Sequence, residues 1–229
     1  MSAESSKTQS LRSKEFIDKY FGGNVIDIGA GNDPVVNHAE VFDLIHGDAQ
    51  EILTYREKSS YDCVNSSHCL EHMKDVPAAL SQWWGLVKPG GYLVTVVPHE
   101  DLYEQGVWPS IFNYDHKATF RINKENTWSP VSYDVHSLFN SLPNAIFISA
   151  EVQDKDYDYS LSGKKLGQFS IKIYKWRGSK NKIKKFISGV LYNFLYINFW
   201  TKDKNNTGIP VDQTLNDAMA QIQIVLQKK

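Results

Sequence analysis

The chain has 229 residues, of which 41% are hydrophobic and 22% are charged, and its formal net charge at pH 7 is −1. This length allows one well-formed hydrophobic core, and the net charge argues against non-specific nucleic-acid binding as the main task. The two cysteines are predicted to be free thiols in a reducing compartment. We find neither a secretory signal nor an apolar run of about 20 residues, so we expect a cytoplasmic protein.

Apolar runs and helical spacing alternate through the first hundred residues. Strands are predicted at 24–28, 39–44, 46–49, 61–69 and 92–98. Helices are predicted at 10–20, 50–58 and 75–87, and a sharp turn is predicted at Lys88–Gly91. Strand–helix–strand alternation with short connections is typical of an α/β fold with an open, mostly parallel, doubly wound sheet.

The pattern changes after residue 98. Residues 99–133 are rich in aromatic, acidic and histidine side chains and lack a regular period, which is typical of a functional insert over the carboxyl edge of the sheet. A helix is predicted at 134–142 and a strand at 145–154. Either 168–176 or 220–228 could provide the final strand of the sheet.

These elements divide the chain into a core of residues 1–154, whose insert would serve as a substrate lid, and an extension of residues 155–229. The extension contains a basic, aromatic segment at 181–200 that is predicted to be a helix. It is too short to span a bilayer but could lie in the membrane interface. The alternative is a helix packed on the core or in a homodimer contact.

A Gly-x-Gly loop follows the first strand, within Val25–Pro34, and lets backbone N–H groups approach a ligand. Pro34 stands where a dinucleotide-binding loop has its third glycine, and the Gly-Lys-Ser/Thr of a phosphate-binding loop is absent. Asp27, two residues before Gly29, suits a ligand with a positive amino or sulfonium group. Asp43 could accept hydrogen bonds from both hydroxyls of a ribose, and the residues after it would pass an adenine edge.

Several motifs together resemble the class I S-adenosylmethionine-dependent methyltransferases. They are Asp27–Asn32 (DIGAGN), Asp43, Asp48-Ala49, and residues 61–98 with their Leu-Glu-His and Lys-Pro-Gly-Gly sequences. The resemblance implies a Rossmann-like fold and S-adenosyl-L-methionine as the cofactor. By this resemblance the cofactor-binding residues are Asp27, Gly29, Ala30 and Gly31 in the loop, Asp43 at the ribose, Asp48 and Ala49 at the adenine, and Ser66 and His68 beside the methionine and sulfonium.

Each of these acidic residues also has a structural interpretation. Asp27 could cap a neighbouring loop, and Asp43 could be an exposed strand end. In the resembled family the pair Glu71-His72 mostly orders the loop after the fourth strand, so we do not expect it to act in catalysis.

Methyl transfer is an in-line displacement at a sulfonium carbon, and a hydroxyl nucleophile needs help from a base or a metal. His99, Glu100 and Asp101 follow a strand at the edge where ligands bind in open α/β sheets, and His116 is the other candidate base. These four are the predicted catalytic residues; the alternative is that they hold the insert together. Glu100, Asp101, His116 and the nearby Asp115 are suitable metal ligands. Their spacing along the chain matches no known metal-binding motif, so no metal site is predicted.

The insert also offers side chains for an acceptor. Tyr103, Trp108, Asn113 and Tyr114 are predicted to contact the substrate, whereas Trp128 is assigned to the insert's own core. Residues 98–120 resemble, more loosely, inserts of bacterial methyltransferases of surface-polysaccharide biosynthesis. That resemblance implies O-methylation of a sugar or polysaccharide-linked intermediate at the inner face of the membrane. The alternatives are O- or N-methylation of a small aromatic or lipid-like acceptor, and a non-catalytic cofactor-binding scaffold.

Overall fold

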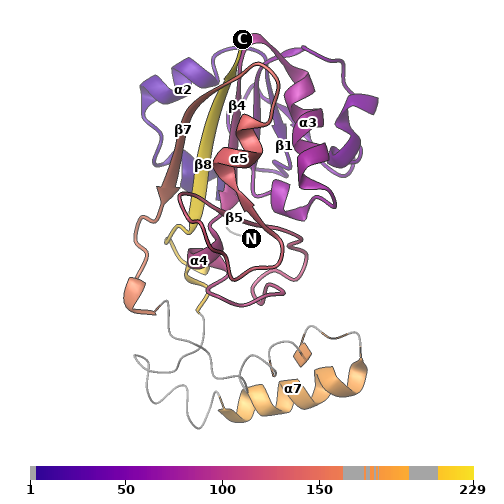
Figure 1. Ribbon diagram of the computed structural model, residues 1–229, viewed down its shortest axis with the longest axis vertical. Coiled ribbons are helices and arrows are strands. Elements are labelled where there is room, and N and C mark those ends of the chain that lie inside the picture. Colours follow the sequence, from indigo (N-terminus) through magenta and orange to yellow (C-terminus); the bar gives the residue numbers. More distant parts are fainter. Residues whose placement is uncertain (1–3, 162–172, 174–175, 178, 180, 196–210) are drawn as a thin grey trace.

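The computed structural model describes residues 4–161, 173, 176–177, 179, 181–195 and 211–229 (Figure 1). Its main sheet has the strand order β2-β1-β3-β4-β8-β7. The bounds of these strands are β1 Val25–Ile28, β2 Glu40–Phe42, β3 Tyr61–Ser67, β4 Val87–Pro98, β7 Ala145–Gln153 and β8 Gln221–Lys228. Strands β1 to β4 pair in parallel, and β8 runs antiparallel between β4 and β7.

The predicted α/β fold with an open, mostly parallel sheet is therefore confirmed. Of the two candidates for the final strand, 220–228 forms β8, which lies between β4 and the edge strand β7. Most of the other candidate, 168–176, lies outside the described residues.

Helices flank the sheet in the described part of the chain. Their bounds are α1 Glu4–Gln9, α2 Lys14–Tyr20, α3 Val76–Leu86, α4 Glu100–Tyr103, α5 Val135–Asn140 and α7 Lys182–Leu195, with the 3-10 helices η1 Ala49–Thr54, η2 Leu70–His72, η3 Tyr159–Leu161 and η5 Gln213–Leu215. Ser13, Asp75 and Asp134 cap α2, α3 and α5 by accepting a backbone hydrogen bond in the first turn. Among the helices described, none combines the length and apolar character needed to cross a membrane.

Side chains alternate along the strands between two hydrophobic cores, as the period of two requires. Val25 and Cys63 belong to one core, which Tyr20 of α2 joins. Their neighbours Ile26 and Val64 belong to the larger core, which includes side chains of α3 and α5. In Figure 1, α2 and α3 accordingly lie on opposite sides of the strands.

Several predicted elements differ from the structure. Residues 46–49 form no strand: His46 ends a turn, and Ala49 begins η1, which the Asp48 side chain caps. The helix predicted at 10–20 begins after Ser13, which accepts a hydrogen bond from the first turn of α2. The polar helix predicted at 50–58 is the shorter 3-10 helix η1.

A bulge replaces the sharp turn that was predicted at Lys88–Gly91. Strands β3 and β4 pair on both sides of this segment, so it lies within β4 instead of before it. Gly90 has a φ of +82°, which a residue without a Cβ adopts easily. Lys88 Nζ binds Asp62 Oδ1 at 2.9 Å and ties the bulge to β3.

The insert of residues 99–133 contains its own small structure. It begins with α4 and includes β5 (Thr119–Arg121), which pairs in parallel with β6 (Ser132–Asp134). The backbone N–H of Lys117 donates to the Glu71 carbonyl at 2.7 Å, which joins the insert to the segment after β3. The insert therefore contacts the carboxyl edge of the sheet.

Candidate active site

The glycine loop follows β1 at the carboxyl edge of the sheet. Gly29 has a φ of +80° and Gly31 a φ of +57°. A Cβ on Gly29 would lie 2.8 Å from the Cys69 Cβ atom, and the Gly29 N–H donates to the Phe42 carbonyl at 2.8 Å. The Gly31 N–H donates to Asp43 Oδ2 at 3.0 Å. The loop thus lies between the end of β2 and the segment after β3, with no room for a side chain at Gly29.

Asp27 lies beneath this loop and is 1% exposed. Its Oδ2 accepts a hydrogen bond from the Val35 N–H, and its Oδ1 accepts one from Asn65 Nδ2, both at 2.6 Å. Burial raises the pKa of Asp27 to about 6, although the two hydrogen bonds oppose the shift. The carboxyl group anchors the loop and also forms part of a cavity wall.

A first cavity, of about 730 Å³, opens beside the end of β2. Its lining includes Gly29, Asp43, Leu44, Gly47, Asp48, Ala49 and Tyr55. Asp43 Oδ1 accepts a hydrogen bond from the Leu44 N–H at 2.7 Å. The Leu44 side chain itself is 86% exposed, so the cavity offers an uncovered apolar surface beside carboxylates.

A second cavity, of about 750 Å³, lies between the glycine loop and the insert. Polar and ionisable groups are frequent in its lining, which includes Asp27, Ala30, Gly31, Ser67, Glu71, Tyr103, Asn113, His116 and Gln221. Gly29, His68 and His72 line both cavities. The two cavities therefore adjoin at these three residues.

A buried ionisable cluster stands where the cavities meet. Glu71 is 1% exposed, and its Oε1 lies 3.9 Å from Nε2 of both His72 and His116 and 3.6 Å from His68 Nδ1. Burial alone raises the pKa of Glu71, but the nearby histidines more than offset this effect and hold the pKa below its usual value. On its other side, His116 Nδ1 lies 2.7 Å from Glu104 Oε1.

Three of the four predicted catalytic residues take part in the framework of the insert. His99 Nδ1 accepts hydrogen bonds from two backbone N–H groups at the start of α4, and burial lowers the pKa of this histidine. Glu100 is fully buried and accepts hydrogen bonds from two threonine hydroxyls. Asp101 binds Lys124 and Trp128 Nε1. These three residues line neither cavity, whereas His116 lines the second.

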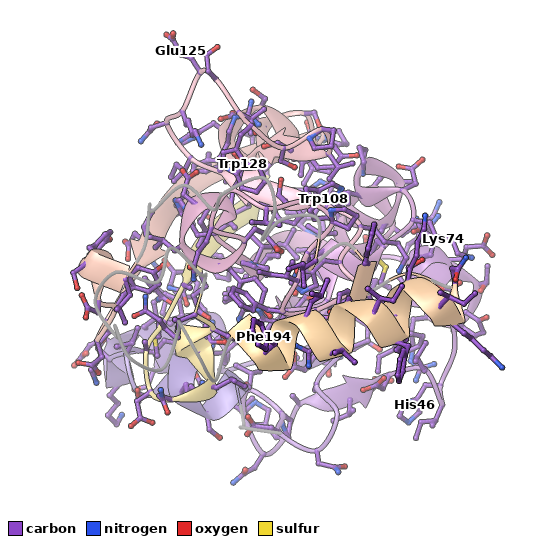
Figure 2. The ribbon with its side chains drawn as sticks, turned by 90° about the horizontal axis from the view of Figure 1, so that it is seen from below. His46, Lys74, Trp108, Glu125, Trp128 and Phe194 are labelled. Carbon is purple, nitrogen blue, oxygen red and sulfur yellow. The ribbon has the colours of Figure 1, made fainter. Side chains whose placement is uncertain are left out.

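The predicted substrate and cofactor residues are also distributed unevenly. Tyr103 and Asn113 line the second cavity. Tyr114 is 56% exposed, and Trp108 lines neither cavity; Figure 2 shows Trp108 and Trp128 in the insert. Ser66 is fully buried, and its hydroxyl donates to the Ile28 carbonyl at 3.2 Å. Sequence patterns did not indicate Leu44 or Tyr55, which have ordinary local sequence contexts.

A family model described as a methyltransferase domain matches residues 9–140, which is more than half of the chain. The chain belongs to this methyltransferase family. It is an S-adenosylmethionine-dependent methyltransferase, as the class I motifs predicted.

Solved structures with a similar fold come from different organisms. An S-adenosylmethionine-dependent methyltransferase of Archaeoglobus fulgidus has 15% identity and a TM-score of 0.48, over 98% of this chain and 94% of that chain. The YcgJ protein of Bacillus subtilis has 12% identity and a TM-score of 0.46, over 90% of this chain and 92% of that chain. Among curated proteins, none matches the sequence of this methyltransferase.

Proposed function

We propose that this methyltransferase transfers the methyl group of S-adenosyl-L-methionine to a hydroxyl oxygen of a sugar or a polysaccharide-linked intermediate. The pair of adjoining cavities carries the proposal, because one suits a nucleoside and the other a hydroxyl-rich acceptor. Bound S-adenosylmethionine supplies an activated methyl group: the acceptor oxygen bonds to the methyl carbon while the carbon–sulfur bond breaks and its electron pair stays on sulfur.

The first cavity is assigned to the nucleoside. Asp43 would hold the ribose by hydrogen bonds, since each carboxylate oxygen that binds a loop N–H keeps a further lone pair. Asp48 and Ala49 would hold the adenine edge, and the exposed Leu44 side chain offers the ring an apolar surface. Asp27, with Gly29 above it, places negative charge near the methionine end of this cation.

His116 is assigned as the base. The Glu104 carboxylate can only accept a hydrogen bond, so His116 Nδ1 donates to it, and Nε2 keeps a lone pair on the side of Glu71. The acceptor proton passes to Nε2 as the carbon–oxygen bond forms, and Glu104 stabilises the resulting imidazolium. His99 suits this role less well, because its Nδ1 already caps α4.

The lining of the second cavity supports a saccharide over the aromatic or lipid-like alternative. Asn113, His116 and Glu71 offer donors and acceptors that match the hydroxyl groups of a sugar, and Tyr103 offers a ring on which a sugar can pack. A flat apolar acceptor would desolvate these polar groups without giving them hydrogen bonds, which lowers affinity.

The test is transfer from methyl-labelled S-adenosylmethionine to separated acceptor fractions: lipid-linked saccharides, nucleotide sugars, and aromatic or lipid-like small molecules. We expect label in a saccharide fraction and a loss of turnover of about 100-fold or more in His116→Gln, with unchanged calorimetric binding of S-adenosylhomocysteine. Label confined to the aromatic or lipid-like fraction would select the alternative acceptor. Binding without label in any fraction would identify a scaffold.

A further inference from the structure

The Glu71 carboxylate is a buried charge without a direct hydrogen bond. Neither of its oxygens has a hydrogen-bond partner, although both are buried. A buried polar group in this state destabilises a fold, and a charged one does so more strongly. In native proteins such a group has a specific reason, such as a catalytic role or a bound water or ion. The Glu71 side chain also lines the second cavity, so a ligand can reach it.

Two histidines present the same ring nitrogen to this carboxylate. His72 Nδ1 lies 3.0 Å from Asp115 Oδ2, and His116 Nδ1 lies 2.7 Å from Glu104 Oε1. Because each Nδ1 has a carboxylate partner, each Nε2 is left on the side of Glu71, 3.9 Å from its Oε1. A carboxylate on Nδ1 that orients Nε2 is the outer-shell arrangement found around histidines that ligate metals.

We infer that Glu71, His72 and His116 bind a divalent transition-metal ion of the Zn²⁺ type. One possible ligand atom from each residue lies within 4.8 Å of the other two. Ligands about 2.1 Å from a tetrahedral ion are about 3.4 Å apart, so a small closing movement completes the site. Two imidazoles and one carboxylate form a ligand set that suits Zn²⁺ better than Mg²⁺ or Ca²⁺, which prefer oxygen ligands.

A direct ion pair between Glu71 and protonated histidines explains the cluster less well. A protonated imidazole would donate its Nε2–H to the carboxylate at about 2.7–2.9 Å. The observed distances of 3.9 Å from both Nε2 atoms leave space between the three groups. His68 Nδ1 comes closer, at 3.6 Å from Glu71 Oε1, and is the histidine that contributes most to lowering the pKa of Glu71, while its Nε2 lies 2.8 Å from Gln221 Oε1.

The role of the ion in catalysis rests on the proposed function. The cluster lies at the junction of the two cavities, beside His72, where an acceptor hydroxyl has to meet the methyl group. An ion there would lower the pKa of a hydroxyl that binds to it, and the hydroxyl proton would leave to water. His116 Nε2 would then be a ligand and could not also take the proton, so the ion would replace His116 as the group that activates the hydroxyl. The carbon–oxygen bond would still form as the carbon–sulfur bond breaks.

The test measures binding of Zn²⁺ to the full chain after treatment with a chelator, by competition with a chromogenic chelator and without S-adenosylmethionine. We expect one tightly bound Zn²⁺ per chain, and at least about 100-fold weaker binding in Glu71→Gln and in His116→Gln. Asp115→Asn, which changes a partner of His72, should weaken binding by about 10–100-fold. The control His136→Gln removes a histidine that packs on Phe147 and should bind as the wild type does.

Thermal unfolding gives a second readout. A hundredfold excess of Zn²⁺ over its Kd should raise the melting temperature of the wild type by about 5–10 °C and leave that of Glu71→Gln unchanged. Failure of the wild type to bind Zn²⁺, or binding by Glu71→Gln and His116→Gln that is as tight as that of the wild type, would overturn the metal site. Methyl transfer by metal-free enzyme leaves the proposed function in place and overturns the inferred role of the ion. Zn²⁺ binding without methyl transfer to any acceptor supports the site and overturns the proposed function.

Discussion

At the scale of single residues, Asp43 is placed to act on both the loop and the cofactor. Its carboxylate accepts hydrogen bonds from the N–H groups of Gly31 and Leu44. Asp43→Ala removes these acceptors and the proposed bonds to the ribose, so we expect affinity for S-adenosylmethionine to fall about 10–100-fold in calorimetry. Glu40→Ala, in the strand that ends just before Asp43, is the control, because Glu40 contacts Arg56 and Tyr61. Equal losses in the two variants would contradict a specific role for Asp43.

Asp27 gives a prediction for the dependence of stability on pH. Its pKa is raised from 3.8 to about 6 by burial, so between these values the folded state holds the proton and the unfolded state releases it. The free energy of unfolding therefore decreases as pH rises from about 4 to 6, by about 3 kcal/mol from this residue. Denaturant titrations across this range should show the decrease in the difference between the wild type and Asp27→Asn.

The variant Asp27→Asn is a close match in shape. The Oδ1 atom of Asn65 is buried without a hydrogen-bond partner, so a flip of the Asn65 amide lets it accept from the substituted side chain. The hydrogen bond from the Val35 N–H can also be kept. A free-energy difference between the two proteins that stays constant from pH 4 to pH 6 would show that Asp27 does not titrate in this range.

At the scale of elements, strands could be predicted because burial on both faces demands continuous apolar runs. Strand β1 and the second part of β4 follow such runs in the sequence, whereas β3 also contains the buried polar residues Asn65 and Ser66. The bulge at Lys88–Gly91 could not be predicted, since a Pro-Gly-Gly sequence is equally compatible with a turn before a strand. Its place within β4 depends on pairing with β3 and on the contact between Lys88 and Asp62.

In the insert, the sequence likewise could not predict which partners the side chains have. A polar sequence directly after a strand predicts a ligand-binding edge, and the three residues from His99 to Asp101 satisfy that rule. Glu100 nevertheless binds Thr119 and Thr127, which follow it by 19 and 27 residues. A buried carboxylate with such partners stabilises the fold of the insert. Its partners become apparent only when β5 and the following loop are placed in space.

At the scale of the whole molecule, the cavities combine residues that no local pattern connects. The placement of the glycine loop beside Asp43 could be predicted from one stretch of the chain, because class I motifs keep the two at characteristic positions. Glu71 and His116 lie 45 residues apart in the sequence, and the insert brings them to 3.9 Å. The spacing of possible ligands along the chain therefore gave no metal signal, whereas their arrangement in space does.

Helix α7 presents an apolar face that is open to solvent. Ile183, Phe186, Ile187, Val190 and Phe194 recur at helical spacing, and each side chain is at least 39% exposed. In Figure 1 the helix lies beyond the end of the molecule that carries α4, and Figure 2 shows Phe194 on it. Lysines at 182, 184 and 185 add positive charge at its start. This combination is typical of a helix that lies in the interface of an anionic membrane.

Flotation with lipid vesicles tests whether α7 binds a membrane surface. We expect the wild type to float with vesicles that contain anionic lipid, to float less at high salt, and to bind poorly to zwitterionic vesicles, because the lysines contribute through charge. Phe186→Glu should reduce the floated fraction several-fold, since it places a charge in the apolar face. Leu215→Glu is the matched control, because Leu215 is 77% exposed but lies outside α7. If the wild type stays at the bottom of the gradient without vesicles, or if Phe186→Glu and Leu215→Glu float equally, α7 serves instead as a packing or homodimer surface. A packing or homodimer surface, unlike a membrane contact, would not bring a polysaccharide-linked acceptor near the active site.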